Sequence, residues 1–307
     1  IDRSAKIIHN NHRMKIVVTG NAGFIASHIT DAYRALGHTV IDVDNRHKKP
    51  IDINDAAALV ALFKKEKPDI VNHHAAIAEV LKSVRDPIPT FQTNVLGTVN
   101  VLMASGACGT VKKFIFSSTS ALYGDPKKLP VTENAAIDPV SPYGLAKYMA
   151  EEAIIFYAKL FKFNYLIFRY PNVYGPRQNP HGEAGVVAIF TELMRKEKQP
   201  TIFGDGTKAR DYAYIEDIVR ANVIALKKGK NEILNLGWSK PVTDQTIFNE
   251  IAKHTGFKGT PIYAPYRIGE VYKTSLSPKK ALTIIGWKPM ISFAEGVKRH
   301  VRYTDGA

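Results

Sequence analysis

The sequence predicts an α/β fold with a doubly wound parallel sheet and a smaller, loop-rich C-terminal part. Short apolar segments alternate with longer helical segments over the first half of the chain, and the first apolar segment passes into a helix through a glycine-rich turn. The chain has 307 residues, of which 45% are hydrophobic and 23% charged. A chain of this size and composition can bury a sizeable core, in one large domain or in two joined ones.

The N-terminal region contains the first strand and the first helix. Residues 1–13 are polar and basic without periodicity, so we expect a frayed or vector-derived extension there. Lys15–Thr19 is a short apolar strand, and Gly20-Asn21-Ala22-Gly23 leads from it into a helix that ends near Leu36. The glycines permit a tight turn and let backbone N–H groups reach a pyrophosphate, while Ala26 lets the helix pack closely on the strand. This order predicts a Rossmann-type dinucleotide site.

The second strand ends in a carboxylate that bears on the choice of cofactor. Residues 39–43 form this strand, and Asp44 follows it, 24 residues after Gly20. A carboxylate in this place binds the ribose hydroxyls of NAD and repels the 2′-phosphate of NADP. The basic segment Arg46-His47-Lys48-Lys49 comes next and could offset that repulsion. Asp44 therefore favours NAD, and NADP stays open as the alternative.

The alternation of helices and strands continues as far as a cluster of hydroxyl side chains. The predicted elements are a helix opened by residues 52–55 and ending at Lys67, a strand at 69–72, a helical region from 87 to 108, and a strand at 113–116. Ser117, Ser118 and Thr119 follow this last strand. Ligands of doubly wound sheets bind at the carboxyl ends of the strands, so a hydroxyl there could bind a substrate oxygen. A Ser/Thr turn that satisfies its own backbone is the alternative.

A helix that begins after Ser141 carries a Tyr and a Lys four residues apart. Ser141 suits the N-cap and Pro142 the first helical position. Tyr143 and Lys147 then share one face, and a nearby ammonium favours the ionised phenol that proton transfer requires. The alternative is an amphipathic helix with a solvent-facing Lys. The same spacing in Tyr123-Gly124-Asp125-Pro126-Lys127 predicts a turn instead, because Gly and Pro break a helix.

The C-terminal part is rich in Gly, Pro and polar loops. A strand at 165–170 precedes it, and the later predicted elements are a helix near 185–196, a strand near 233–236, a helix near 243–254 and a helix from about 292. The break near Pro171 predicts a cofactor domain at 14–171 and a mainly substrate-binding domain at 172–307, with some later elements returning to the sheet. Loops on such a scaffold are where a substrate site is built.

Bulk composition disfavours several classes of protein. No apolar run approaches the length of a membrane span, and the single cysteine, Cys108, excludes an internal disulfide and a multi-cysteine metal site. The net charge of +14 comes from scattered pairs of basic residues without interleaved aromatic side chains, which does not indicate a nucleic-acid platform. We expect a cytoplasmic protein without a membrane or nucleic-acid partner.

These motifs together resemble the extended short-chain dehydrogenase/reductases, and most closely the UDP-glucose 4-epimerase type. The resemblance runs from Lys15 to about Tyr303. It rests on Thr19-Gly20-Asn21-Ala22-Gly23-Phe24-Ile25-Ala26, Asp44-Asn45, Asp52-Ile53, His73-His74-Ala75-Ala76, Asn94-Val95-Leu96-Gly97-Thr98, Phe116-Ser117-Ser118-Thr119, Ser141-Pro142-Tyr143-Gly144, Asn172-Val173-Tyr174-Gly175-Pro176-Arg177, His181-Gly182-Glu183, Arg210-Asp211-Tyr212 and Arg267-Ile268-Gly269-Glu270-Val271.

The resemblance implies three groups of site residues. The catalytic set would be Tyr143, Lys147 and Thr119. The cofactor contacts would come from Gly20, Asn21, Gly23, Phe24, Ile25, Ala26, Asp44, Asn45, Asp52, Ile53, Ala75, Ala76, Asn94, Ser117, Tyr143, Lys147 and Tyr170. The nucleotide sugar would be held by Thr119, Asn172, Phe203, Arg210, Arg267 and Glu270, with Phe203 against the base.

The resemblance also implies the reaction, which belongs to galactose metabolism. An NAD-dependent UDP-hexose 4-epimerase would interconvert UDP-glucose and UDP-galactose through a transient 4-keto sugar, as Tyr143 takes the proton of the 4-hydroxyl and hydride passes to NAD and back to the other face. No metal is implied. The family-level expectation is a homodimer through the helices around Met103 and Tyr148. The segment after Asn45 is shorter than usual in the family, which predicts an open adenosine end.

Several relatives of this reaction remain as alternatives. Dehydratases of the family follow the catalytic Thr with acidic residues, whereas Ser120-Ala121-Leu122 follow Thr119 here, so dehydration is disfavoured. Epimerisation of a UDP-N-acetylhexosamine or a UDP-uronic acid stays open, and so does a nucleotide-sugar reductase. A non-catalytic nucleotide-binding protein would be expected to lack the catalytic set, which is present.

Overall fold

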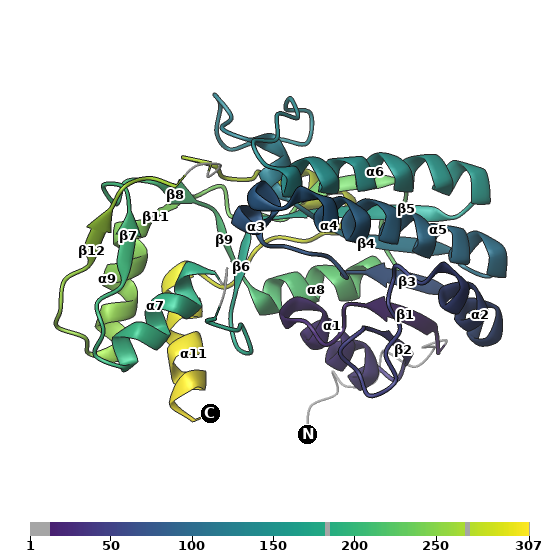
Figure 1. Ribbon diagram of the computed structural model, residues 1–307, viewed down its shortest axis with the longest axis horizontal. Coiled ribbons are helices and arrows are strands. Elements are labelled where there is room, and N and C mark those ends of the chain that lie inside the picture. The colour runs from purple at the N-terminus through teal and green to yellow at the C-terminus, as the bar shows by residue number, and fades with distance from the viewer. Residues whose placement is uncertain (1–12, 182–184, 268–270, 307) are drawn as a thin grey trace, which may run out of the picture.

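A six-stranded parallel sheet forms the centre of the larger part of the molecule (Figure 1). The computed structural model describes residues 13–181, 185–267 and 271–306. The sheet has the order β10-β5-β4-β3-β1-β2, and its strands are β1 Lys15–Thr19, β2 Thr39–Val43, β3 Ile70–His73, β4 Lys113–Thr119, β5 Asn164–Tyr170 and β10 Glu232–Asn235. All the strand pairs within it are parallel. The chain order reverses between β1 and β3, which is where a doubly wound sheet binds its ligand.

Helices cover both faces of this sheet, as the predicted fold class requires. One face carries α1 Phe24–Ala35, α8 Ile215–Ala225 and α10 Lys279–Ile285, and the other carries α2 Ala56–Glu66, α5 Gly97–Cys108 and α6 Pro142–Phe161. Each layer buries its own apolar core against the strands, with Tyr33 and Trp287 in one and Phe63 and Phe114 in the other. The prediction of a doubly wound α/β fold is therefore confirmed.

The C-terminal part packs around a third core beside the carboxyl ends of the strands (Figure 1). Its helices are α7 Val186–Arg195, α9 Asp244–Thr255 and α11 Phe293–Asp305. Its short strands pair as β6 Asn172–Tyr174 with β9 Tyr212–Tyr214, β7 Thr201–Phe203 with β12 Ile262–Ala264, and β8 Ala209–Arg210 with β11 Val242–Thr243. Both α8 and β10 pack with the sheet: β10 pairs with β5, and α8 covers one of its faces. The proposed domain boundary at residue 171 stays a prediction.

The structure corrects the prediction made for the hydroxyl cluster. The predicted strand at 113–116 extends to Thr119, because Ser117 pairs with Phe168 and Thr119 with Tyr170 of β5. The pairing supplies backbone hydrogen bonds that a local turn would otherwise have to provide. Of the three hydroxyl residues, only Thr119 also makes the local hydrogen bond of a Ser/Thr turn. Its hydroxyl accepts from the Ala121 N–H at 3.1 Å and caps a 3₁₀ turn over Ser120–Tyr123.

The helical region predicted from 87 to 108 is interrupted. It consists of α4 Pro87–Phe91, a π-helical turn at Gln92–Leu96 and α5, and it is preceded by α3 Val80–Arg85, which the sequence did not predict. The helix after Ser141 is confirmed, because the Ser141 hydroxyl accepts from the Gly144 N–H at 3.2 Å and Pro142 is the first helical residue.

A candidate active site

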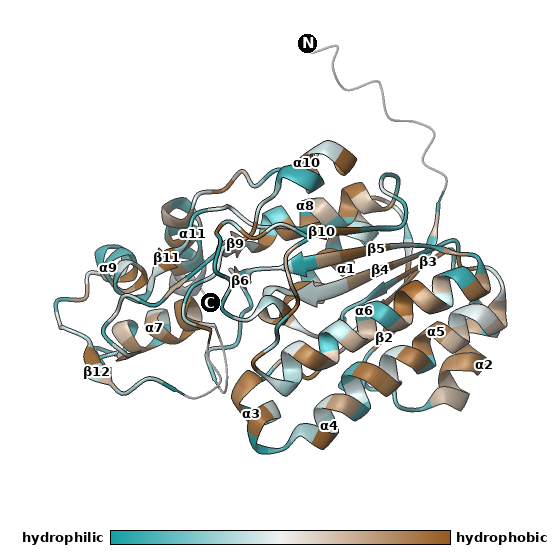
Figure 2. Cartoon of the chain, turned by 90° about the horizontal axis from the view of Figure 1, so that it is seen from above, coloured by the Kyte–Doolittle hydropathy of each residue, from teal (hydrophilic) through white to brown (hydrophobic). Residues whose placement is uncertain are grey.

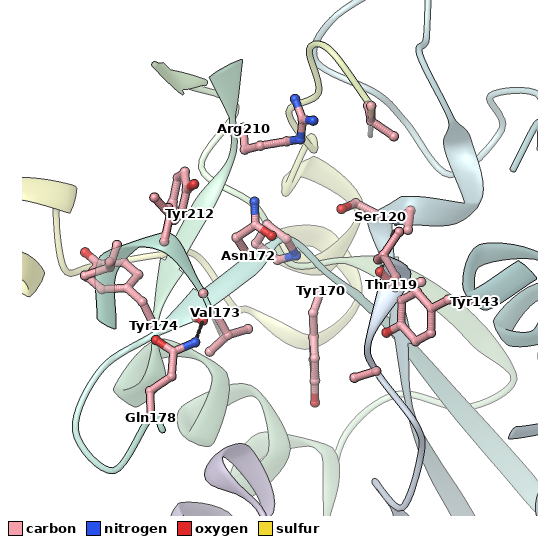
Figure 3. Close-up of a pocket in the computed structure, with 18 of the residues that line it drawn as sticks. Thr119, Ser120, Tyr143, Tyr170, Asn172, Val173, Tyr174, Gln178, Arg210 and Tyr212 are labelled. Carbon is pink, nitrogen blue, oxygen red and sulfur yellow. Dashed lines mark hydrogen bonds between the residues drawn. The ribbon is translucent and has the colours of Figure 1, made fainter. Parts of the chain in front are cut away.

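A cavity of about 990 Å³ opens at the carboxyl ends of the strands. Its walls come from the glycine turn, the ends of β4 and β5, the start of α6 and the C-terminal part (Figure 3). The predicted site residues that line it are Gly20, Gly23, Phe24, Ile25, Ala26, Ala76, Ser117, Thr119, Tyr143, Lys147, Tyr170, Asn172, Phe203, Arg210 and Arg267. Residues predicted for the cofactor, the chemistry and the sugar nucleotide therefore meet in one continuous space.

The glycine turn is shaped to receive an anionic group. Gly20 has a φ of +70°, and a Cβ added there would stand 2.7 Å from the backbone nitrogen of Ala75. The Gly23 N–H donates to the Gly20 carbonyl at 2.9 Å, and α1 starts behind it without a side-chain cap. Uncapped N–H groups at a helix N-terminus attract phosphate oxygens. The turn therefore fits the pyrophosphate of a dinucleotide.

Replacing Gly20 by Ala should disrupt this turn. The added Cβ meets backbone atoms that cannot move aside, and the positive φ adds strain of about 1–2 kcal/mol. We expect the dissociation constant for NAD, measured by calorimetric titration, to rise at least about tenfold. Gly37→Ala is the matched control, because Gly37 also has a positive φ, +82°, but nothing lies within 4 Å of the added atom. Equal NAD affinities in the two variants would contradict this account of the turn.

A neutral histidine holds the strand ends below the cavity. The Thr19 hydroxyl accepts from the backbone N–H groups of His74 and Ala75 at 3.1 and 3.0 Å, so it donates to His73 Nδ1 at 2.6 Å. His73 Nε2 therefore carries the proton and donates to Thr98 Oγ1 at 2.9 Å. Burial lowers the pKa of His73 well below its usual range, and burial lowers the pKa of His74 to about 3.

These pKa shifts predict that acid destabilises the protein. Unfolded His73 and His74 bind protons below about pH 6.5, whereas the folded residues stay neutral, so stability is lost as the pH falls from about 6.5 towards 3. Each histidine contributes a slope of about 1.4 kcal/mol per pH unit over that window. Urea unfolding at several pH values should show the slope reduced by about this amount in His74→Gln. An unchanged slope in the variant would contradict the assignment.

The predicted catalytic set comes together at one end of the cavity. Figure 3 shows Thr119 next to Tyr143, and the two side chains share a hydrogen bond. The Tyr143 backbone N–H donates to Ser83 Oγ at 3.1 Å, which ties the start of α6 to α3. Lys147 is buried, donates from Nζ to the Ser117 carbonyl at 2.8 Å and lies 4.6 Å from the centroid of the Phe116 ring. The alternative of a solvent-facing Lys is therefore wrong.

Burial is the main influence on the pKa values of Tyr143 and Lys147 in this structure. Burial raises the pKa of Tyr143, and the hydrogen bond from Thr119 lowers it only in part. Burial lowers the pKa of Lys147 itself to about 7, while the charge of Glu151 works in the opposite direction. For each group burial is the largest cause of the shift, and it favours the neutral form. Both side chains line the same cavity, and the predicted ionisation of Tyr143 with help from Lys147 stays a prediction.

A buried asparagine that the sequence did not single out holds Tyr170 in the cavity wall. Asn222 of α8 donates to the Tyr170 hydroxyl at 2.9 Å, and its own Oδ1 accepts from Asn72 at 3.0 Å. The Tyr170 ring stacks on His74 with centroids 6.2 Å apart. The signal in the sequence is an Asn between the apolar residues Ala221 and Val223, and its role becomes clear only from the packing of α8 on the sheet, which buries it fully.

The opposite wall carries the residues predicted for the sugar nucleotide. Asn172 and Arg210 extend from this wall in Figure 3, and Arg210 donates to the carbonyls of Ala209 and Tyr272. The Arg267 guanidinium carbon lies 3.4 Å from the centroid of the Phe203 ring, so one face of this ring is already covered. A base could contact only the other face of Phe203.

Known proteins are similar to this chain in sequence and in structure. A profile of the NAD dependent epimerase/dehydratase family matches residues 16–237. The chain belongs to this family.

Relatives in the family are similar over nearly the whole chain. The UDP-glucose 4-epimerase of Thermotoga maritima, solved with UDP-glucose, is 42% identical with a TM-score of 0.92, and the match covers 95% of this chain and 99% of that one. The UDP-glucose 4-epimerase of Thermus thermophilus, solved with NAD, is 36% identical with a TM-score of 0.89, over 96% and 100% of the two chains. A Methanocaldococcus jannaschii protein provisionally named UDP-glucose 4-epimerase is 43% identical, over 94% and 97% of the two chains. A UDP-glucuronate 4-epimerase of Thermodesulfobacterium geofontis is 33% identical, over 94% and 95%.

Some predicted cofactor residues lie outside the cavity lining. Asn94 donates to and accepts from the backbone of Ile77 at 2.8 Å, so its amide is engaged with the chain itself. Asn45 donates to Asp52 at 3.1 Å, and Ile53 is buried in the core. The others in this group are Asn21, Asp44, Asp52 and Ala75, while Glu270, predicted for the nucleotide sugar, falls outside the residues that the structure describes. The roles of all these residues in this epimerase family member stay predictions.

The part of the chain that the structure describes contains neither a candidate membrane span nor a candidate metal cluster. None of its helices combines the length and the apolar character that crossing a membrane requires. Within the same residues, no three or more His, Cys, Asp or Glu side chains cluster in a way that could hold a metal ion.

Proposed function

We propose that this protein is an NAD-dependent UDP-hexose 4-epimerase that interconverts UDP-glucose and UDP-galactose through a transient 4-keto sugar. The observation that carries the proposal is the single cavity in which Tyr143 and Thr119 stand between the glycine turn and the two arginines Arg210 and Arg267. The relatives named UDP-glucose 4-epimerase support it, and their matches span nearly the whole chain.

Each catalytic side chain has a role that its surroundings allow. NAD, when bound, supplies the acceptor that takes hydride from the sugar and returns it. Tyr143, from its place in the cavity lining, moves the proton of the 4-hydroxyl. Thr119 accepts from the Ala121 N–H and orients the Tyr143 hydroxyl. Lys147, held by the Ser117 carbonyl at the cofactor side, supplies a titratable charge near neutral pH.

The arginines at the opposite wall suit a diphosphate. Arg210 and Arg267 place two guanidinium groups in the cavity lining, and guanidinium binds phosphate oxygens through paired hydrogen bonds. A substrate anchored there would leave its hexose at the Tyr143 end. A site that grips the nucleotide more firmly than the hexose would let the 4-keto sugar turn over between the two half-reactions.

The proposal also includes a homodimer, a cytoplasmic location and a role in galactose metabolism. An apolar surface on α5 and α6 supports a homodimer, since Met103, Met149, Phe156 and Leu160 are all exposed there and stretches of both helices are coloured brown in Figure 2. Exposed apolar patches of this kind mark protein interfaces. The cytoplasmic location and the role in galactose metabolism are predictions that follow from the enzyme activity.

The experiment that tests this function is a substrate panel. The purified protein is incubated with UDP-glucose, UDP-galactose, UDP-N-acetylglucosamine and UDP-glucuronic acid, and the configuration at C4 is followed by proton NMR. We expect UDP-glucose and UDP-galactose to interconvert to an equilibrium mixture without net NADH. Faster conversion of the uronic or N-acetylated sugar would move the assignment to that substrate, for which family members exist. Conversion of none of them would overturn the proposal.

A further inference from the structure

Arg46 closes over the carboxylate that the sequence assigns to the adenosine ribose. Arg46 donates from Nε to Asp44 Oδ1 and from a terminal nitrogen to Oδ2, both at 2.9 Å. The backbone N–H groups of Arg46 and Ala22 add one hydrogen bond each at 3.0 Å. These four donors fill the roughly four lone-pair sites of a carboxylate. Ribose hydroxyls would therefore find the acceptor oxygens of Asp44 already engaged.

The guanidinium also stands against the glycine turn. One terminal nitrogen of Arg46 lies 3.4 Å from the point where a Cβ on Gly23 would be. The Asp44 side chain is only 3% exposed, whereas that of Arg46 is 59% exposed. Asp44 uses two of the three nitrogens of the fork, so the carboxylate orients the guanidinium while most of its surface faces solvent. An oriented, exposed guanidinium next to a pyrophosphate site is suited to a second phosphate group.

The residues after Arg46 add positive charge to the same end. His47 Nε2 lies 3.0 Å from the Asn21 Oδ1 of the glycine turn, which fixes the segment against it. Lys48 and Lys49 follow and are exposed. Between Asp44 and Lys49 there is one carboxylate and there are three permanent cations. The field at this end therefore attracts an anion even though Asp44 is present.

We propose that Arg46 makes this protein bind NADP as well as NAD, with the guanidinium taking the 2′-phosphate and Asp44 orienting the guanidinium instead of excluding that phosphate. The inference rests on the proposed nicotinamide cofactor and assigns the residue that sets its selectivity. An Asp at this position normally selects NAD by repelling the 2′-phosphate, and an Arg nearby accommodates it. Here the two residues form one ion pair, which removes the repulsion and leaves the cation in place.

Binding of the two cofactors to the full chain, freed of any bound nucleotide, tests this directly. Isothermal titration with NAD and with NADP should give dissociation constants within about a hundredfold of each other. Arg46→Ala should weaken NADP binding at least about tenfold, because the phosphate then faces an uncovered Asp44, and should leave NAD binding unchanged or tighter. Arg34→Ala is the control, since Arg34, in the last turn of α1, also pairs with a carboxylate: one of its terminal nitrogens donates to both oxygens of Asp42, at 2.6 and 2.8 Å.

Two results would overturn the inference. One is NADP binding to the unmodified protein more than about a hundredfold weaker than NAD binding. The other is an Arg46→Ala variant that loses affinity for both cofactors equally, which would make Arg46 a structural residue of the turn. Failure to bind either cofactor would be a different result, because it would reject the nicotinamide cofactor itself and the inference with it. Thermal unfolding of each variant shows whether the fold is retained.

Discussion

Tyr143→Phe is expected to lower kcat for interconversion of UDP-glucose and UDP-galactose by about 10²–10⁴-fold. The substitution removes only the hydroxyl that moves the proton, and the ring keeps its place beside Thr119 in the cavity wall. Binding of UDP-glucose, measured by titration, should change by no more than about threefold, because the arginines of the opposite wall are untouched. A fall in kcat without a matching change in binding identifies a group that acts in the chemical step.

Tyr123→Phe is the control for this experiment. Tyr123 stands in the same Tyr-x-x-x-Lys spacing, but its hydroxyl donates to Asn235 at 2.9 Å and accepts from Arg169 at 2.7 Å in the core. Its loss should reduce stability by about 1–2 kcal/mol and leave kcat within a few-fold of the unmodified enzyme. If Tyr143→Phe retained most of its activity, or if Tyr123→Phe lost as much, the catalytic assignment of the α6 pair would be wrong.

Glu151→Ala should reduce the free energy of unfolding by about 3–5 kcal/mol. The Glu151 side chain is fully buried, and it accepts from Arg169 Nε at 3.0 Å, from an Arg169 terminal nitrogen at 2.6 Å and from the Ser118 hydroxyl. Removing the carboxylate would leave the Arg169 charge, only 4% exposed, without its partner in the core. Breaking a buried pair by removing one member is one of the most destabilising single changes that a protein can undergo.

Urea unfolding followed by circular dichroism measures this effect, and Glu152→Ala is its control. Glu152 is the next residue on α6 and is exposed, so its replacement should change stability by no more than about 0.5 kcal/mol. Similar stabilities for the two variants would show that the buried pair contributes little. The pair also fixes the end of β4, since Ser118 belongs to that strand, and so it supports the segment that presents Thr119 to the cavity.

The sequence alone predicts those parts of the fold that neighbouring residues determine. The strand Lys15–Thr19, the glycine turn after it and the capped start of α6 are each specified by neighbouring residues, and the structure confirms all three. The cavity then brings together most of the predicted site residues, because parallel strands end at one edge of the sheet.

Long-range contacts determine what the sequence did not predict. Ser117 to Thr119 extend β4 only because β5 lies beside them. Asn222 matters through its contact with Tyr170, 52 residues away in the chain. The pKa of Lys147 falls to about 7 because the fold buries it, which spacing along a helix cannot reveal. The sequence shows Arg46 only as a positive charge close to Asp44. The structure shows that its guanidinium donates two hydrogen bonds to the Asp44 carboxylate.

The central claim, reversible oxidation of the sugar at C4, is tested most directly with UDP-glucose that carries deuterium at C4. The unmodified enzyme is incubated with this substrate in ordinary water, without added reductant, and the UDP-galactose formed is examined by mass spectrometry and NMR. The account predicts that the product retains the deuterium at C4, since the same hydrogen leaves the sugar and returns to its other face. Product with deuterium lost to water would contradict the account, because it would indicate that C4 exchanges its hydrogen as a proton with solvent.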